Sequence, residues 1–148
     1  AMTGWRLGYS VWPKDVFPHA EKLCVNIHSC VNAAAQFAGL EALTGPQDAV
    51  SEMLTAFDAR RKVIVKELND VPGFRCIEPG GAFYAFPNIE GTGMKAQALQ
   101  EKLLEEAGVA VIAGTSFGGF GEGYLRFSYA NSTENIIEAI ARIRKCLA

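Results

Sequence analysis

The chain has 148 residues, of which 49% are hydrophobic, 20% are charged and 10% are aromatic, and its formal net charge is -2. That composition suits a globular chain with one core, and the charge balance lacks the basic surface that nucleic acid or an anionic membrane requires. No apolar run reaches the roughly 18 residues of a membrane helix, so we expect a cytoplasmic protein with neither nucleic acid nor membrane among its partners.

The first half of the chain predicts one strand followed by two helices. Residues 5–11 have the aromatic and β-branched content of a short strand. Apolar residues at three- and four-residue steps predict a helix over 19–43, which Gly45 and Pro46 end. A second helix is predicted over 47–69.

The second half alternates short strands with helices. The predicted strands are 74–77, 82–86, 109–112 and 124–129. The predicted helices are 94–107 and a last one that follows the N-capping residues 131–133. This order indicates an α+β fold in which helices cover a small mixed or antiparallel sheet.

Residues 114–123 are rich in glycine, and Gly114-x-Ser116-x-Gly118 matches the nucleophile motif of serine esterases. No histidine follows Ser116, so a catalytic triad would need His19 or His28 as its base. The candidates for the acid that orients such a base are Asp48, Asp58 and Asp70. Because the loop leads into a strand and not a helix, we expect a structural turn and no phosphate cradle.

A metal centre is not expected. The two histidines stand nine positions apart on one predicted helix and therefore face different ways, and no Cys-x-x-Cys pair supports them.

Three segments, in order, resemble one known family. They are Ala-Met-Thr-Gly-Trp-Arg-Leu-Gly-Tyr at 1–9, Gly-Gly-Ala-Phe-Tyr at 80–84 and Tyr-Leu-Arg-Phe-Ser-Tyr-Ala at 124–130. Together they resemble the C-terminal portion of the fold-type I, class I/II aminotransferases that depend on pyridoxal 5'-phosphate (PLP), in the aspartate aminotransferase-like group. The resemblance covers nearly the whole chain. It implies that residues 46–148 form the family's small domain with its linking helix, and that residues 1–45 are a strand-helix remnant of the large PLP-binding domain.

The resemblance also implies site residues. Arg6 matches the family arginine that binds the cofactor phosphate, and Arg126 matches the arginine that clamps the substrate carboxylate. The implied substrates are an amino acid and a 2-oxo acid. The lysine that binds PLP covalently would fall three positions before Ala1, so we expect these 148 residues alone neither to hold PLP nor to transaminate.

Three functions therefore stay open. The chain is part of a PLP-dependent amino-acid aminotransferase, a serine esterase that uses Ser116, or a non-catalytic pairing module. The predicted strand over 5–11 would lack neighbours, and an unpaired edge strand tends to associate with another chain, so we expect a homodimer or a higher oligomer.

Overall fold

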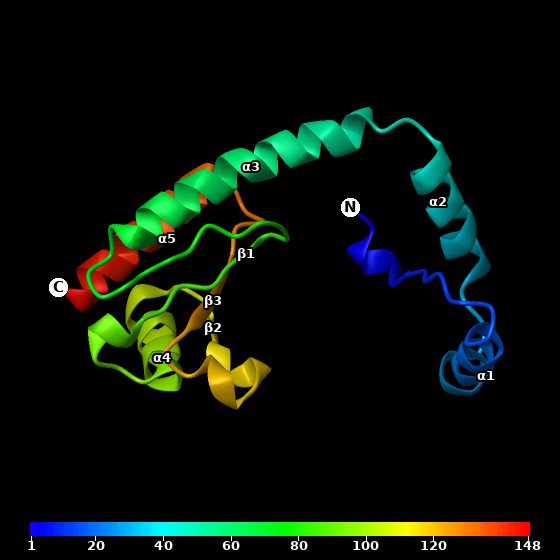
Figure 1. Cartoon of the computed structure of the whole chain (residues 1–148). Coiled ribbons are helices and arrows are strands. Elements are labelled where there is room, and N and C mark those ends of the chain that lie inside the picture. Colours follow the sequence, from blue (N-terminus) through cyan, green and yellow to red (C-terminus); the bar gives the residue numbers. More distant parts are fainter. The chain divides into compact units, whose positions relative to one another are not determined.

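The computed structural model describes residues 1–148 and divides them into two compact units, Ala1–Val50 and Ser51–Ala148. The α-helices and strands of both units are labelled in Figure 1. None of the helices combines the length and the apolarity that a bilayer crossing demands. Assignment of residues 1–45 to a large PLP-binding domain stays a prediction.

The first unit contains short helices and no strand. Its elements are the 3-10 helix Thr3–Trp5, α1 (Phe17–His28), α2 (Ala33–Thr44) and the first residues of α3 (Asp48–Asn69). The predicted strand over 5–11 is therefore wrong. The 3-10 turn ends at Arg6 in a left-handed conformation, with φ of 52°, and the irregular chain beyond it has no strand to pair with. The expected homodimer or higher oligomer rests on this strand being unpaired. Without the strand that reason no longer holds, and the oligomer stays a prediction.

The predicted helix over 19–43 is divided into α1 and α2. Ser29 leaves the helical conformation with φ of 59°, while its N–H still donates to the carbonyl of Val25. Asn32 then caps α2, because its side-chain oxygen accepts the N–H of Ala35 at 3.0 Å. A polar N-cap within the predicted helix was the signal for this break.

The first unit has almost no buried core. Ala35 is its one buried residue, while the stripe that predicted the helix is exposed by 61% at Leu23, 67% at Ile27 and 51% at Val31. Exposed apolar surface of this extent is typical of regions that contact another protein surface.

The second unit has the expected α+β fold, with a small antiparallel sheet covered by helices. Its strands are β1 (Tyr84–Ala85), β2 (Ile112–Ala113) and β3 (Leu125–Ser128), in the order β1-β3-β2. Its helices are most of α3, α4 (Ala96–Ala107) and α5 (Thr133–Leu147). The strands are shorter than predicted, and the one predicted over 74–77 is reduced to a single bridge between Arg75 and Asn88.

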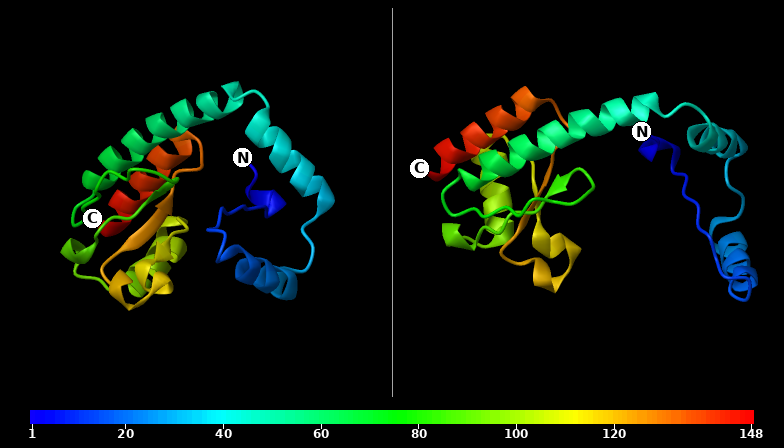
Figure 2. Two further views of the ribbon diagram at one scale, coloured as in Figure 1. Left: turned by 45° about the vertical axis from the view of Figure 1, so that its right-hand side comes forward. Right: turned by 45° about the horizontal axis from the view of Figure 1, so that its top comes forward.

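Helices α3 and α5 lie side by side in both views of Figure 2. The Arg144 guanidinium of α5 donates to the carboxylate of Glu67 at 2.7 Å and to its backbone carbonyl at 3.0 Å. The core between the helices and the sheet is aliphatic and aromatic. Its fully buried members include Leu68, Leu99, Leu103, Leu125, Ile140 and Ile143.

We expect Leu68→Ala to destabilise the second unit by about 2–5 kcal/mol, because it removes fully buried methyl groups of α3 and leaves a cavity. The matched control is Leu54→Ala in the same helix, where the side chain is 68% exposed and the change should stay within about 0.5 kcal/mol. Urea unfolding followed by far-UV circular dichroism measures both. Equal losses would contradict the core described above.

Candidate functional site

Arg126 lies on the face of the sheet that the helices leave open. Within β3, Leu125 and Phe127 are buried, whereas Arg126 is half-buried and Ser128 is exposed. Successive side chains of a strand point to opposite faces, so burial of the two apolar residues turns Arg126 away from the core. No acidic side chain of the unit pairs with its guanidinium.

Two aromatic rings cover the Arg126 guanidinium. Its central carbon lies 4.4 Å from the ring centroid of Tyr84 and 4.4 Å from that of Phe117. Cations over aromatic faces at this distance are attracted by the ring quadrupole. Two rings therefore lie against the guanidinium, and its N–H donors have no hydrogen-bond partner within the chain.

The backbone before Tyr84 is held by Tyr129. The Tyr129 hydroxyl donates to the carbonyl of Ala82 at 2.8 Å, and its N–H donates to the carbonyl of Phe83 at 2.9 Å. Burial raises the pKa of the Tyr129 phenol. Ala82 has φ of 60°, a conformation that a residue with a Cβ adopts only when its surroundings impose it.

The glycine-rich loop is a pair of 3-10 turns, Gly114–Phe117 and Gly119–Gly121. A Cβ on Gly114 would overlap the carbonyl oxygen of Gly121, and a Cβ on Gly121 would overlap that of Gly114. Glycine is thus needed at these two positions for backbone to pack on backbone. The loop is the structural turn that the sequence predicts, and it sets the place of Phe117.

Glu122 ties the end of this loop to α4. Its carboxylate accepts the N–H of Ala96, the first residue of α4, at 2.9 Å and the N–H of Gly123 at 3.0 Å. Lys95, at the N-cap position, makes no side-chain capping bond, so Glu122 caps the helix from a distant part of the chain. These two backbone donors lower the pKa of Glu122, the bond from Ala96 most strongly.

Ser116 is exposed on the first 3-10 turn and has no hydrogen-bond partner in its unit, which contains no histidine. His19 and His28 are exposed on α1 of the other unit, so the structure gives no shared geometry for the serine and a base. Asp58, one of the candidates for the acid that would orient the base, already pairs with two basic side chains. Lys62 and Arg61 both bond to its carboxylate and lower its pKa.

Arg6 is exposed in the first unit. One guanidinium nitrogen donates to the carbonyl of Thr3 at 3.3 Å, and no carboxylate pairs with the group. Its other donors have no partner, and the phosphate contact that the resemblance implies stays a prediction. Arg6 and Arg126 belong to different units, and the binding role that the resemblance implies for each stays a prediction.

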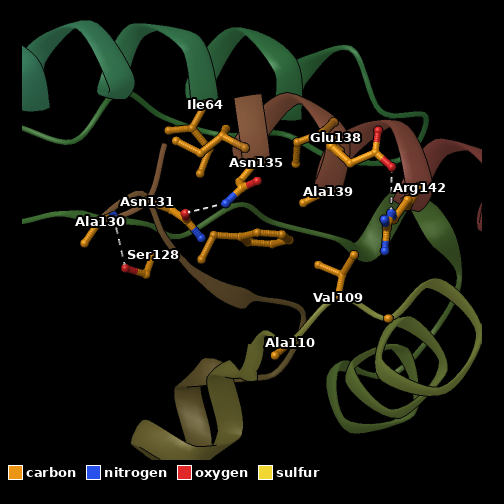
Figure 3. Close-up of a pocket in the computed structure, with 14 residues that line it drawn as sticks. Ile64, Val109, Ala110, Ser128, Ala130, Asn131, Asn135, Glu138, Ala139 and Arg142 are labelled. Carbon is orange, nitrogen blue, oxygen red and sulfur yellow. Dashed lines mark hydrogen bonds and ion pairs between the residues drawn. The ribbon is translucent and has the colours of Figure 1, made fainter. Parts of the chain in front are cut away.

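A groove of about 410 Å³ lies beside the first turns of α5 (Figure 3). Four of its polar side chains bond in pairs, since Asn135 donates to Asn131 at 2.9 Å and Arg142 donates to Glu138 at 2.8 Å. Two residues of β3 line it, Phe127 and Ser128, and Arg126 is not among its lining residues. Sequence reasoning did not anticipate this groove.

Comparison with known proteins places nearly all of the chain in one family. The model of the aminotransferase class I and II family matches residues 1–143. The aspartate aminotransferase of Pyrococcus horikoshii is 50% identical over 149 residues, covering 99% of this chain and 38% of the relative. The aromatic-amino-acid aminotransferase 2 of Thermococcus litoralis is 38% identical, with 99% of this chain and 38% of the relative covered.

A solved structure of the aromatic aminotransferase from Pyrococcus horikoshii also matches, with a TM-score of 0.89 and 40% identity. The match covers 97% of this chain and 39% of that one. The chain therefore spans about two fifths of the length of these relatives.

Glu122→Gln should remove an acid-sensitive part of the stability of the second unit. A carboxylate whose pKa is lowered by folding stabilises the fold above its unfolded pKa of about 4.3, and the contribution is lost as the pH falls through the lowered value. We expect the wild type to exceed the variant in urea midpoint at pH 6 and the difference to shrink below pH 4. Glu105→Gln, at an exposed position of α4, is the control. A difference that does not change with pH would contradict this role.

Proposed function

The chain belongs to the class I and II aminotransferase family, and on that premise we propose that it supplies an aminotransferase with the arginine that binds the substrate carboxylate. The substrates of such an enzyme are an amino acid and a 2-oxo acid. Arg126 is the clamp, and the second unit is the small domain that closes over the substrate.

The observation that carries this proposal is the state of Arg126. The guanidinium is half-buried, has no acidic partner in its unit and projects from the open face of the sheet. An arginine held in this way is well suited to an external carboxylate, because two parallel N–H donors match two carboxylate oxygens. Such a bidentate bond fixes the orientation of the substrate before reaction at Cα.

Arg6 is proposed as a contact to the cofactor phosphate. Its unpaired donors and permanent charge suit phosphate oxygens. PLP, when bound, supplies the electron sink that amino-group transfer requires. Arg6 and Arg126 bind and orient, and neither can replace a lysine that holds PLP covalently.

The carboxylate role can be tested in a chimera in which this chain replaces the matched 149-residue segment of the Pyrococcus horikoshii aspartate aminotransferase. Arg126→Gln should lower kcat/KM for aspartate and 2-oxoglutarate by roughly 100-fold, because two charge-assisted bonds are lost. Arg126→Lys keeps the charge but not the planar fork and should give a smaller loss.

Arg75→Gln is the control for that assay. Arg75 is exposed at the bridge to Asn88 and forms no ion pair, so its removal should leave kcat/KM within about twofold. If Arg126→Gln behaved like this control, the carboxylate role would be excluded.

The esterase alternative stays a prediction with a direct test. Because Ser116 has no hydrogen-bonded base in its unit, we expect the mass of the intact chain to stay unchanged after exposure to a fluorophosphonate, which labels activated serines. An adduct mapped to Ser116 and lost in Ser116→Ala would instead favour the hydrolase, with His19 and His28 as the next positions to mutate.

The pairing module would be supported by co-elution of the chain with a full-length aminotransferase.

A further inference from the structure

We propose that Tyr84 and Phe117 are positioning residues that hold the Arg126 guanidinium between their rings and leave only its N–H edge for a carboxylate. This inference rests on the proposed role of Arg126 and names the residues that orient its guanidinium. Neither ring is expected to touch the reacting atoms.

The two rings reach Arg126 from the two flanks of β3. Tyr84 belongs to β1, which pairs along one edge of β3, and Phe117 follows β2, which pairs along the other. Each ring centroid lies 4.4 Å from the central carbon of the guanidinium. Since the arginine comes from the strand between them, rings from opposite flanks enclose it.

Both rings are themselves held by further aromatic contacts. Phe83 lies 4.6 Å from Tyr84 between ring centroids, and Phe86 meets Phe117 edge to face at 6.4 Å. Phe86 in turn stacks on Tyr124 at 5.3 Å with an interplanar angle of 7°. Tyr84 and Phe117 thus belong to two separate aromatic groups that meet only at Arg126. Rings fixed by such pairs resist reorientation.

The backbones that carry the rings are fixed as well. The bonds from Tyr129 to Ala82 and Phe83 hold the segment that leads into Tyr84. The close approach of Gly114 and Gly121 holds the turn that ends in Phe117. The position of the guanidinium is therefore set by two rigid segments that are far apart in the sequence.

Covered faces restrict how a ligand can approach. A guanidinium is planar, and its donors point outward in its own plane. In the proposed arrangement one ring lies against each face, so that an anion reaches the donors only along the edge, in the orientation that forms two parallel bonds to a carboxylate. A group held in this orientation before binding loses less conformational freedom when the ligand arrives.

The test uses the whole 148-residue chain labelled with ¹⁵N-arginine, and the Arg126 side-chain signal is assigned by its loss in Arg126→Lys. In the absence of ligand, we expect restricted rotation about the Nε–Cζ bond. Tyr84→Leu and Phe117→Leu should each speed this rotation by about 2- to 30-fold, the range that corresponds to one cation–π contact. Tyr84→Phe and Phe117→Tyr keep a ring at each position and should preserve the restriction.

Phe120→Leu is the matched control, because this ring is fully exposed on the same loop and contacts no other ring or cation. Tyr84 is half-buried and Phe117 is 53% exposed, so the leucine variants should keep the fold, which amide spectra would verify. Rotation equal to wild type in both leucine variants would overturn the inference.

Titration with 2-oxoglutarate separates this inference from the proposed function. We expect the Arg126 signals to shift on binding, and the leucine variants to raise the Kd by the same 2- to 30-fold. Restricted rotation without any response to 2-oxoglutarate would remove the carboxylate role and leave the positioning role in place. An equal Kd for 2-oxoglutarate in the wild type and the leucine variants would show that the rings do not contribute to carboxylate binding by Arg126.

Discussion

The alternation of side chains along β3 is the constraint on which the site depends. Burial of Leu125 and Phe127 against the helices places Arg126 on the open face of the central strand. A slip of one residue would bury the guanidinium and expose two large apolar side chains. The hydrophobic burial that folds the second unit therefore also fixes the arginine, and the flanking strands each contribute a ring beside it.

The elements that the sequence predicted well are those whose signal is local and long. The helix predicted over 47–69 is α3 (Asp48–Asn69), and the last helix begins after Ser132, which accepts the N–H of Asn135 as predicted for an N-cap. Strand lengths were overestimated because a strand extends only as far as its partner pairs with it, which local sequence does not encode. The segment 5–11 has strand-like residues and no partner.

For the site, sequence resemblance pointed to Arg126 but not to its surroundings. Phe117 stands inside the motif that suggested a serine nucleophile, and Tyr84 stands at the end of Gly-Gly-Ala-Phe-Tyr. Both were visible as residues of a motif, yet their contact with Arg126 depends on the strand order β1-β3-β2. Contacts made by distant segments follow from topology, and no local spacing reveals them.

The exposed apolar stripe of the first unit has a consequence for how the chain unfolds. Helices α1 and α2 have 12 residues each, a length at which an isolated helix is marginal in water, and the unit buries only Ala35. Amide hydrogens there should exchange with solvent through local opening, while those of α3 to α5 in the second unit need a larger opening of its core. We therefore expect the cooperative unfolding transition of this chain to come from residues 51–148, and the helical signal of the first unit to be lost gradually and separately from that transition.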